Sequence, residues 1–157
     1  MLNDLLGVIW RRVPKKLRRW TMRLSHPRFA VTAGAVITDN QGRVLLLKHR
    51  FRPGTGWGLP GGFMQAGEQP EEALRRELLE EVGLEVEKVE LFFTRAFKVP
   101  MQVEIVFIAR AIGDTNELNF EIQKAGWFSL NELPQELPKD QAQLIKHALN
   151  NGARLQD

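Results

Sequence analysis

The sequence predicts one mixed α/β domain preceded by a basic helical arm. A chain of 157 residues with 43% apolar side chains has the size and apolar content of one ordinary domain. Thirteen glycines and eight prolines indicate many turns, as in proteins that mix strands and helices. Charge and hydrophobic periodicity both change near residue 28. We therefore expect an arm over residues 1–28 and a domain over residues 29–157.

The predicted arm is strongly basic and amphipathic. It holds eight Lys and Arg residues and one acid, Asp4, whereas the remaining 129 residues hold 14 bases and 18 acids. Its apolar residues recur at spacings of three or four, which predicts a helix interrupted at Pro14. They are Leu2, Leu5, Leu6, Ile9, Val13, Leu17, Trp20 and Leu24. Three interpretations stay open: packing on the domain or on a second subunit in a homodimer, attachment to a membrane surface, and contact with RNA.

Several classes of protein are excluded by composition. The chain has no cysteine, which rules out disulfides, thiolate zinc sites and cysteine nucleophiles. No apolar run approaches the roughly 18 to 20 residues that span a bilayer. The positive charge of the N-terminus follows its apolar residues, unlike that of a signal peptide. We expect a cytoplasmic enzyme, held at a membrane surface if the arm binds one.

The first half of the domain begins with two predicted strands. Residues 29–38 and 43–49 have strand-like composition and are joined by a tight turn, where Gly42 supplies the permissive backbone. A charged Gly/Pro loop follows over residues 50–58. A helix is then expected to begin at Pro70 and to end at Gly83. Its apolar stripe consists of Ala73, Leu74, Leu78 and Val82.

The second half alternates strands with turns before a last helix. Residues 84–99 and 101–111 are predicted strands linked around Pro100. A polar loop over residues 113–119 leads to a short segment that ends in Trp127 and Phe128. The last helix is expected over residues 139–149, because its apolar residues recur on one face.

One stretch, residues 62–84 (GFMQAGEQPEEALRRELLEEVGL), carries the functional signal. Residues three and four apart share a helix face, so Glu77, Glu80 and Glu81 should converge. A convergent carboxylate cluster suits Mg²⁺, which prefers oxygen ligands and bridges carboxylates to phosphates. Arg76 is positioned to orient Glu77 through a bidentate pair. A charge run of this kind is often only a solvated helix face, but a chance match to all nine defined positions is on the order of 10⁻⁸.

Residues 62–84 resemble the Nudix box at every defined position, and residues 57–61 also look like that family. Trp127-Phe128 and the later segment 131–134 extend the resemblance, which covers about residues 29–150. It implies an α/β/α sandwich around a mixed sheet. It also implies Mg²⁺- or Mn²⁺-dependent hydrolysis of a pyrophosphate linkage in a nucleoside diphosphate joined to another group.

The resemblance also implies a role for each matching residue. Glu80 and Glu81 resemble the core metal ligands, with the Gly61 carbonyl as a further ligand. Glu77 resembles a metal ligand or the base that prepares water, and Arg76 resembles its orienting partner. Some members use a glutamate outside the box shortly before a tryptophan. Glu121, six residues before Trp127, fits that description, and Glu104 competes with it.

The substrate-binding residues are predicted less directly. Lys48, Arg50 and Arg52 flank the box and are assigned to the substrate phosphates. Glu68 is also assigned to substrate binding, and it can in addition support the acidic network or bind metal. His49 among them is expected to be an ordinary strand-end residue. Three aromatic residues are candidates for stacking on a base: Phe97, Phe93 and Trp57.

Two features bear on the substrate by resemblance. Pro100 lies sixteen residues after the box, as in members that cleave ADP-ribose, and the chain lacks the tyrosine that members cleaving dinucleoside polyphosphates carry. These favour a nucleoside diphosphate sugar or ADP-ribose. The alternative is a nucleoside triphosphate or 5′-RNA pyrophosphohydrolase. An alternative of another class is a non-catalytic module that senses a nucleotide.

Overall fold

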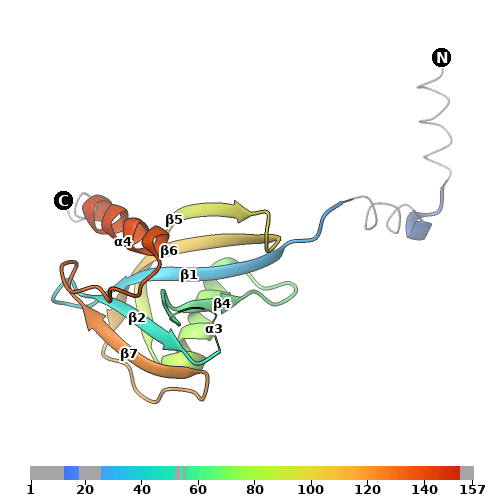
Figure 1. Cartoon of the computed structure of the whole chain (residues 1–157). Helices are drawn as coiled ribbons and strands as arrows, with labels where there is room; N and C mark the ends of the chain where they lie inside the picture. The colour runs from blue at the N-terminus through green and yellow to red at the C-terminus, as the bar shows by residue number, and fades with distance from the viewer. Residues whose placement is uncertain (1–12, 18–25, 52–53, 55, 153–157) are drawn as a thin grey trace.

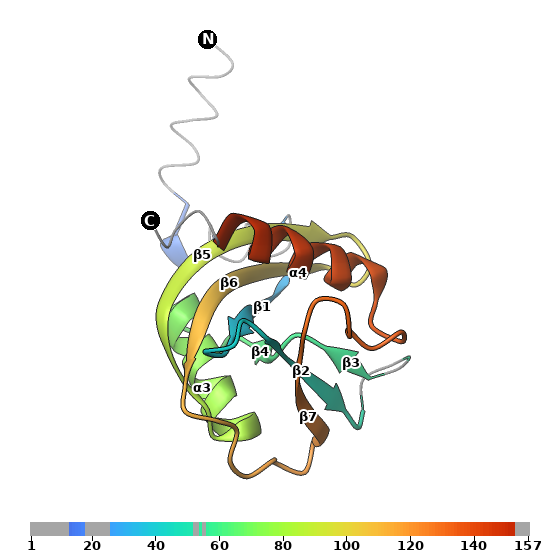
Figure 2. The ribbon, with the colours of Figure 1, turned by 90° about the vertical axis from the view of Figure 1, so that its left-hand side faces the viewer.

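A computed structural model describes residues 13–17, 26–51, 54 and 56–152 of the chain. In this part of the chain a mixed β-sheet lies between two helices (Figure 1). Helix α3 (Pro70–Val82) covers one face and helix α4 (Lys139–Gly152) covers the other. The two helices stand on opposite sides of the strands when the molecule is turned (Figure 2). The predicted α/β/α sandwich is therefore confirmed.

The sheet contains seven described strands. They are β1 (Ala30–Thr38), β2 (Val44–His49), β3 (Trp57–Gly58), β4 (Gly61–Phe63), β5 (Glu85–Phe97), β6 (Gln102–Ile112) and β7 (Ile122–Phe128). The strand order is β3-β2-β1-β6-β5, and two further strands lie off this path: β4 pairs with β1, and β7 pairs with β2. The β1–β6 pair is parallel while the other pairs are antiparallel.

The first two predicted strands form, but they diverge after the turn. They are paired in register only at Thr38 and Val44, on either side of the turn. Strand β4 occupies the place beside the first half of β1, from Thr32 to Gly34. Strand β2 pairs instead with β7. The expected turn is present, with Gly42 at a φ of 74°.

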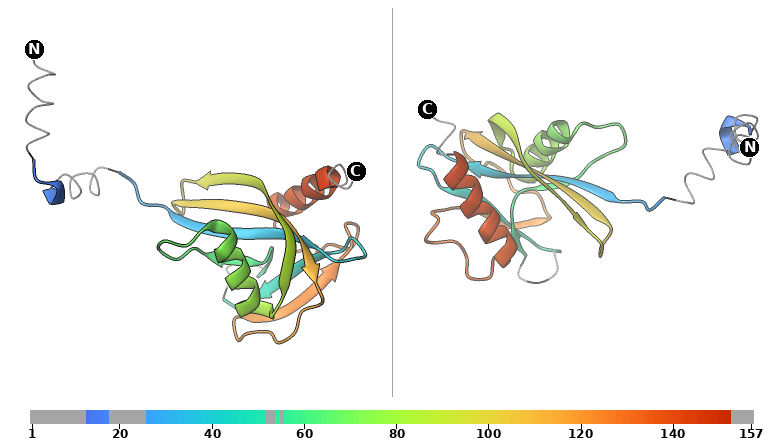
Figure 3. Two further views of the ribbon diagram at one scale, coloured as in Figure 1. Left: turned by 180° about the vertical axis from the view of Figure 1, so that it is seen from behind. Right: turned by 90° about the horizontal axis from the view of Figure 1, so that it is seen from above.

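Helix α3 begins and ends as its sequence predicts. Pro70 occupies the first turn, where its missing N–H costs nothing. The backbone N–H of Gln69 donates to the Glu72 carboxylate at 2.9 Å, and Gly83 ends the helix in the left-handed conformation. The four residues of the predicted stripe are fully buried and pack on the Ala33 face of β1. Helix α3 lies across the strands when the molecule is seen from behind (Figure 3, left). Burial of the apolar stripe therefore fixes the orientation of the helix about its axis.

Helix α4 packs on the other face of the sheet. Its residues Leu144, Ile145 and Ala148 lie against Val36 of β1 and Leu46 of β2. None of the described helices is long and apolar enough to cross a membrane. Most of the predicted arm, and Arg52 among the predicted substrate-binding residues, lies outside the described residues.

Candidate active site

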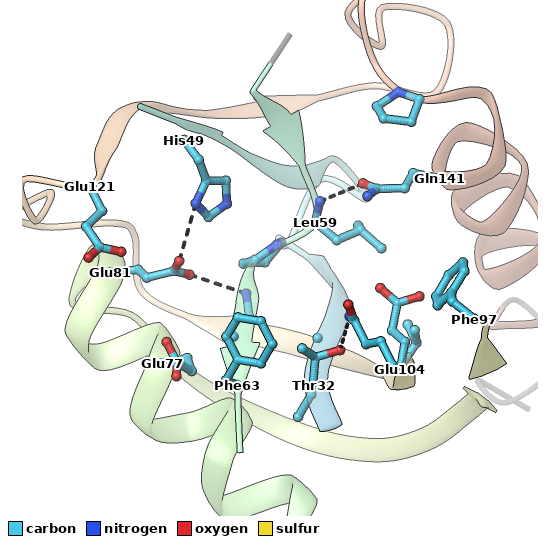
Figure 4. Close-up of a pocket in the computed structure, with 18 of the residues that line it drawn as sticks. Thr32, His49, Leu59, Phe63, Glu77, Glu81, Phe97, Glu104, Glu121 and Gln141 are labelled. Carbon is cyan, nitrogen blue, oxygen red and sulfur yellow. Dashed lines mark hydrogen bonds and ion pairs between the residues drawn. The ribbon is translucent and has the colours of Figure 1, made fainter. Parts of the chain in front are cut away.

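A cleft of about 850 Å³ opens on the sheet beside α3 and the start of α4. Its floor comes from β1, β4 and β6, and its walls come from α3, the segment before β7, the end of β5 and the first turn of α4. Acidic side chains gather at one end (Figure 4). The cleft thus draws on residues from Thr32 to Gln141, which are distant in sequence.

The acidic end is built where α3 meets β4. Glu81 is buried, with 5% of its surface exposed. Its Oε2 accepts a hydrogen bond from the Gly61 N–H at 3.3 Å, and its Oε1 lies 3.7 Å from Nδ1 of His49. Burying a carboxylate is costly unless partners or a cation offset its charge. Its position is therefore well suited to hold a cation against the Gly61 turn.

Glu77 approaches the same turn from the preceding helical turn. Gly62 faces α3, and a Cβ at this position would collide with the Glu77 carboxyl group. Glu77, Glu80 and Glu81 all line the cleft, as their helical spacing predicts. Glu80 is the most exposed of the three, with 56% of its side chain open to solvent.

Arg76 holds this acidic cluster together from one side. Its Nε and Nη2 bind the two oxygens of Glu68 at 2.8 and 3.0 Å. Its Nη1 contacts Glu77 at 2.7 Å and Glu80 at 3.2 Å. The bidentate partner is therefore Glu68, whereas the sequence suggested Glu77. The hydrogen bond between Arg76 and Glu68 lowers the pKa of Glu68 and raises the pKa of Arg76.

Glu121 and His49 lie at the acidic end from the opposite side. Glu121 lines the cleft and lies beside Glu81 in Figure 4. Its backbone N–H donates to the Asn119 side chain at 2.9 Å, and its carbonyl accepts from the Arg50 N–H at 2.7 Å. His49, which sequence reasoning treated as an ordinary strand end, also lines the cleft. The alternation of β2 contained the signal, since Leu45 and Leu47 face α3. His49, two residues further on, lies beside Glu81 of that helix.

The other predicted substrate residues are dispersed. Lys48 points to the opposite face of β2 from His49, with Nζ 5.9 Å from the centre of the Trp57 ring. Arg50 donates from Nε to the Phe120 carbonyl at 3.0 Å. Neither residue lines the cleft, and neither does Glu68. Phe97 does line it, at the end away from the acidic cluster.

Trp57 and Glu104, two further candidates from the sequence, differ in whether they reach the cleft. Trp57 is buried and packs edge-on against Phe128, with ring centres 5.3 Å apart. Glu104, which competes with Glu121 in the sequence, also lines the cleft and binds Arg95.

The donor atoms at the acidic end fit a hard divalent cation. They are carboxylate oxygens of α3 and the backbone at Gly61, which is the oxygen-rich chemistry that Mg²⁺ and Mn²⁺ prefer. Within the described residues, no three acidic or histidine side chains are close enough to hold an ion by themselves. Mg²⁺ is commonly held by one or two carboxylates with substrate phosphates and water completing its shell, so the arrangement suits an ion that binds together with a phosphorylated substrate.

Known proteins share both this sequence and this fold. The family model of the NUDIX domain matches residues 28–148. An ADP-ribose pyrophosphatase of Methanocaldococcus jannaschii is 35% identical over 137 residues, which cover 84% of this chain and 78% of that protein. The NAD-capped RNA hydrolase NudC of Chromobacterium violaceum is 35% identical over 123 residues, or 75% of this chain and 46% of NudC. The chain thus spans about half the length of its NudC relatives.

Solved structures agree with the family match. A MutT NUDIX hydrolase from Burkholderia pseudomallei superposes with a TM-score of 0.67 at 31% identity, covering 76% of this chain and 98% of that one. A NUDIX hydrolase from Nitrosomonas europaea gives a TM-score of 0.72 at 25% identity, covering 82% and 75%. With the matched model spanning the strands, the acidic helix and the cleft, the chain belongs to the NUDIX family.

Proposed function

We propose that this protein hydrolyses the pyrophosphate linkage of a nucleoside diphosphate joined to a second group. The observation that carries the proposal is the buried carboxylate of Glu81, held at the Gly61 turn on the wall of a large cleft. A charged group at this depth in a cleft is typical of a functional site. The hydrolase names of the relatives support the same class of reaction.

The cation we assign to this site is Mg²⁺ or Mn²⁺. Glu77, Glu80 and Glu81 would hold it, together with the carbonyl of Gly61. When bound, such an ion neutralises phosphoryl charge and makes a water molecule more acidic. The role of Arg76 is positional, since it fixes the carboxylate of Glu77 against the cleft.

We assign the proton-accepting role to Glu121. Glu77 is the other candidate, but its carboxylate is already engaged by Arg76 at 2.7 Å. Glu121 is exposed at the cleft, and its side chain makes no ion pair with another described residue. It is therefore available to take a proton from the attacking water.

The substrate we favour is a nucleoside diphosphate sugar or ADP-ribose. The ADP-ribose pyrophosphatase relative matches over 78% of its length, and both Phe97 and Pro100 line the cleft. Phe97 is assigned to the nucleoside part of the substrate. The second candidate is a 5′-RNA pyrophosphohydrolase. The NudC relatives support this candidate, and they match this chain over a smaller share of their own length than the ADP-ribose pyrophosphatase does.

A substrate panel with a matched pair of variants tests this proposal. We expect the full chain to release phosphate-containing products from a nucleoside diphosphate sugar or ADP-ribose only when Mg²⁺ or Mn²⁺ is added. Glu81→Gln should lower kcat by about 100-fold or more, because one charged oxygen ligand is lost. Glu90→Gln, an exposed glutamate of β5, should leave kcat unchanged. Nucleotide binding without any turnover would instead identify a sensor.

We also retain a localising role for residues 1–28 as part of this proposal. The arm would bring a cytoplasmic enzyme to a second subunit, an anionic membrane surface or RNA. Its basic charge is compatible with each of these partners.

A further inference from the structure

The end of the cleft away from the acidic cluster is a second polar site, formed on the floor of the sheet. Residues paired across neighbouring strands point to the same face. Thr32 of β1 pairs with Glu104 of β6, and Glu104 pairs with Arg95 of β5. Two residues before Glu104 in β6, Gln102 pairs with Phe97. These five side chains therefore share the face that lines the cleft.

The carboxylate of Glu104 is fixed in place by a clamp. Arg95 binds Oε2 of Glu104 through Nε, and its Nη1 binds Asp140 of α4 at 2.9 Å. The guanidinium also lies over the Phe97 ring, 4.7 Å from its centre. Only 22% of the Glu104 side chain is exposed. Among the described residues Oε1 of Glu104 has no hydrogen-bond partner, so this oxygen of a cleft-lining residue is available as an acceptor.

Two glutamine side chains extend this pattern with defined amide orientations. Gln102 donates from Nε2 to the Thr32 hydroxyl at 2.9 Å, which leaves its Oε1 as an acceptor. The backbone N–H of Leu59 donates to Oε1 of Gln141 at 2.9 Å, which leaves the Gln141 amide with donors. The site therefore combines a charged acceptor, a neutral acceptor and a donor beside an aromatic ring.

This pattern discriminates between parts of a nucleotide. A phosphate group would be repelled by the Glu104 carboxylate, whereas a group with N–H donors would be attracted. Phe97 and Pro100 give this end of the cleft apolar walls that suit a flat ring. Guanine presents two adjacent donors, its ring N1–H and its amino group, next to a carbonyl acceptor. Adenine presents one amino group, and hypoxanthine lacks the amino group beside its ring N–H.

We propose that Glu104 selects the base of the substrate by accepting the N1–H and amino hydrogens of guanine, with Gln141 donating to the guanine carbonyl. Arg95 and Asp140 act as positioning residues, because they hold the Glu104 carboxylate without contacting the base. The inference rests on the proposed function in taking the ligand to be a nucleotide. Within the two favoured substrate classes, it selects a guanosine diphosphate sugar over ADP-ribose.

Equilibrium binding tests the inference separately from turnover. GMP, IMP and AMP contain no pyrophosphate linkage, so their dissociation constants for the full chain can be measured by calorimetry without hydrolysis. We expect GMP to bind about 10-fold or more tightly than IMP and AMP, because a hydrogen bond to a charged group is lost with each competitor. Glu104→Gln should weaken GMP about 10-fold and abolish the preference.

Two further variants separate base selection from a structural effect. Asp140→Asn loosens the Arg95 clamp without removing the acceptor, so it should weaken GMP binding less than Glu104→Gln does and leave GMP the preferred nucleotide. Glu90→Gln on the exposed part of β5 should change none of the constants. Equal affinity for the three nucleotides, no binding of any of them, or a preference that survives Glu104→Gln would overturn the inference. Hydrolysis of nucleoside diphosphate sugars without regard to the base would overturn it while leaving the proposed function intact.

Discussion

At the scale of single residues, the absence of a side chain at Gly62 shapes the acidic end of the cleft. The Glu77 carboxyl group occupies the space that a Cβ would need. We predict that Gly62→Ala displaces Glu77 from its contact with Arg76 and lowers kcat by about 10-fold or more. The fold should tolerate the change, because the displaced atoms belong to the end of a flexible side chain. Steady-state kinetics and thermal unfolding of the same preparation measure both effects.

At the neighbouring Gly61, in contrast, an added side chain would meet backbone atoms and not the end of a side chain. Gly61 has a φ of 130°, and a Cβ there would collide with the backbone of Ala33 and Gly34. We therefore expect the Gly61→Ala protein to unfold at a lower temperature than the wild type and to lose turnover. A Gly62→Ala protein with full turnover would contradict the assigned position of Glu77.

The sequence predicted the acidic residues more accurately than their partner. Helical spacing alone was sufficient to bring Glu77, Glu80 and Glu81 to one cleft, since residues three and four apart share a face. Adjacent residues on a helix do not face each other, which explains why Arg76 makes only a single-nitrogen contact with Glu77. Its bidentate partner, Glu68, approaches from the turn before the helix, and the geometry of that turn is not encoded by any periodicity.

At the scale of elements, the turn between β1 and β2 is held by an ion pair. Asp39 accepts hydrogen bonds from the backbone N–H groups of Gln41 and Arg43, at 2.9 and 2.8 Å, and from Nε of Arg43 at 2.7 Å. Burial alone would raise the pKa of Asp39, but the bonds from Arg43 and Gln41 outweigh it and hold the pKa below its usual value. The charged form is therefore the one that stabilises this turn.

We predict that Asp39→Asn lowers the free energy of unfolding by about 1 kcal/mol at pH 7. A depressed pKa stabilises the folded state above the unfolded-state pKa, near pH 4. That contribution is lost as the pH falls through the lower folded-state pKa. The difference between wild type and variant should thus shrink below about pH 4. Denaturant unfolding at several pH values measures it, and a difference that stays constant down to pH 2 contradicts the assignment.

The positions of the helices and strands were predictable from the sequence, but the pairing of the strands was not. Period and end signals located α3 and α4, because proline, glycine and an apolar stripe act locally. The same local signals predicted two strands joined by a tight turn, and a tight turn favours pairing between the strands that it joins. In the structure, β4 pairs instead with the first half of β1. Strand β2 pairs with β7, which lies more than seventy residues after β2 in the sequence. Such partners are chosen by long-range packing, which periodicity does not record.

At the scale of the whole molecule, the cleft could not be predicted because it joins distant segments. Thr32, Glu81, Glu104 and Gln141 line one space although each lies in a different element. Without the sheet register, Glu104 reads as an ordinary acid in a strand. Its position on the cleft floor follows only from the parallel pairing of β1 with β6.

This arrangement also determines what the N-terminal arm should contribute. The described residues that line the cleft all lie between Thr32 and Gln141, and β1 begins at Ala30. We therefore predict that deleting residues 1–24 leaves kcat and KM for a small nucleotide substrate within about twofold of the full chain, since surface changes away from a site have small effects. Gel filtration of the same two proteins reports whether the deletion changes the oligomeric state. Loss of both turnover and a dimer would show that the arm completes the fold. Unchanged kinetics with weaker binding to anionic vesicles or to RNA would identify the arm as a localising segment, because its basic charge attracts both surfaces.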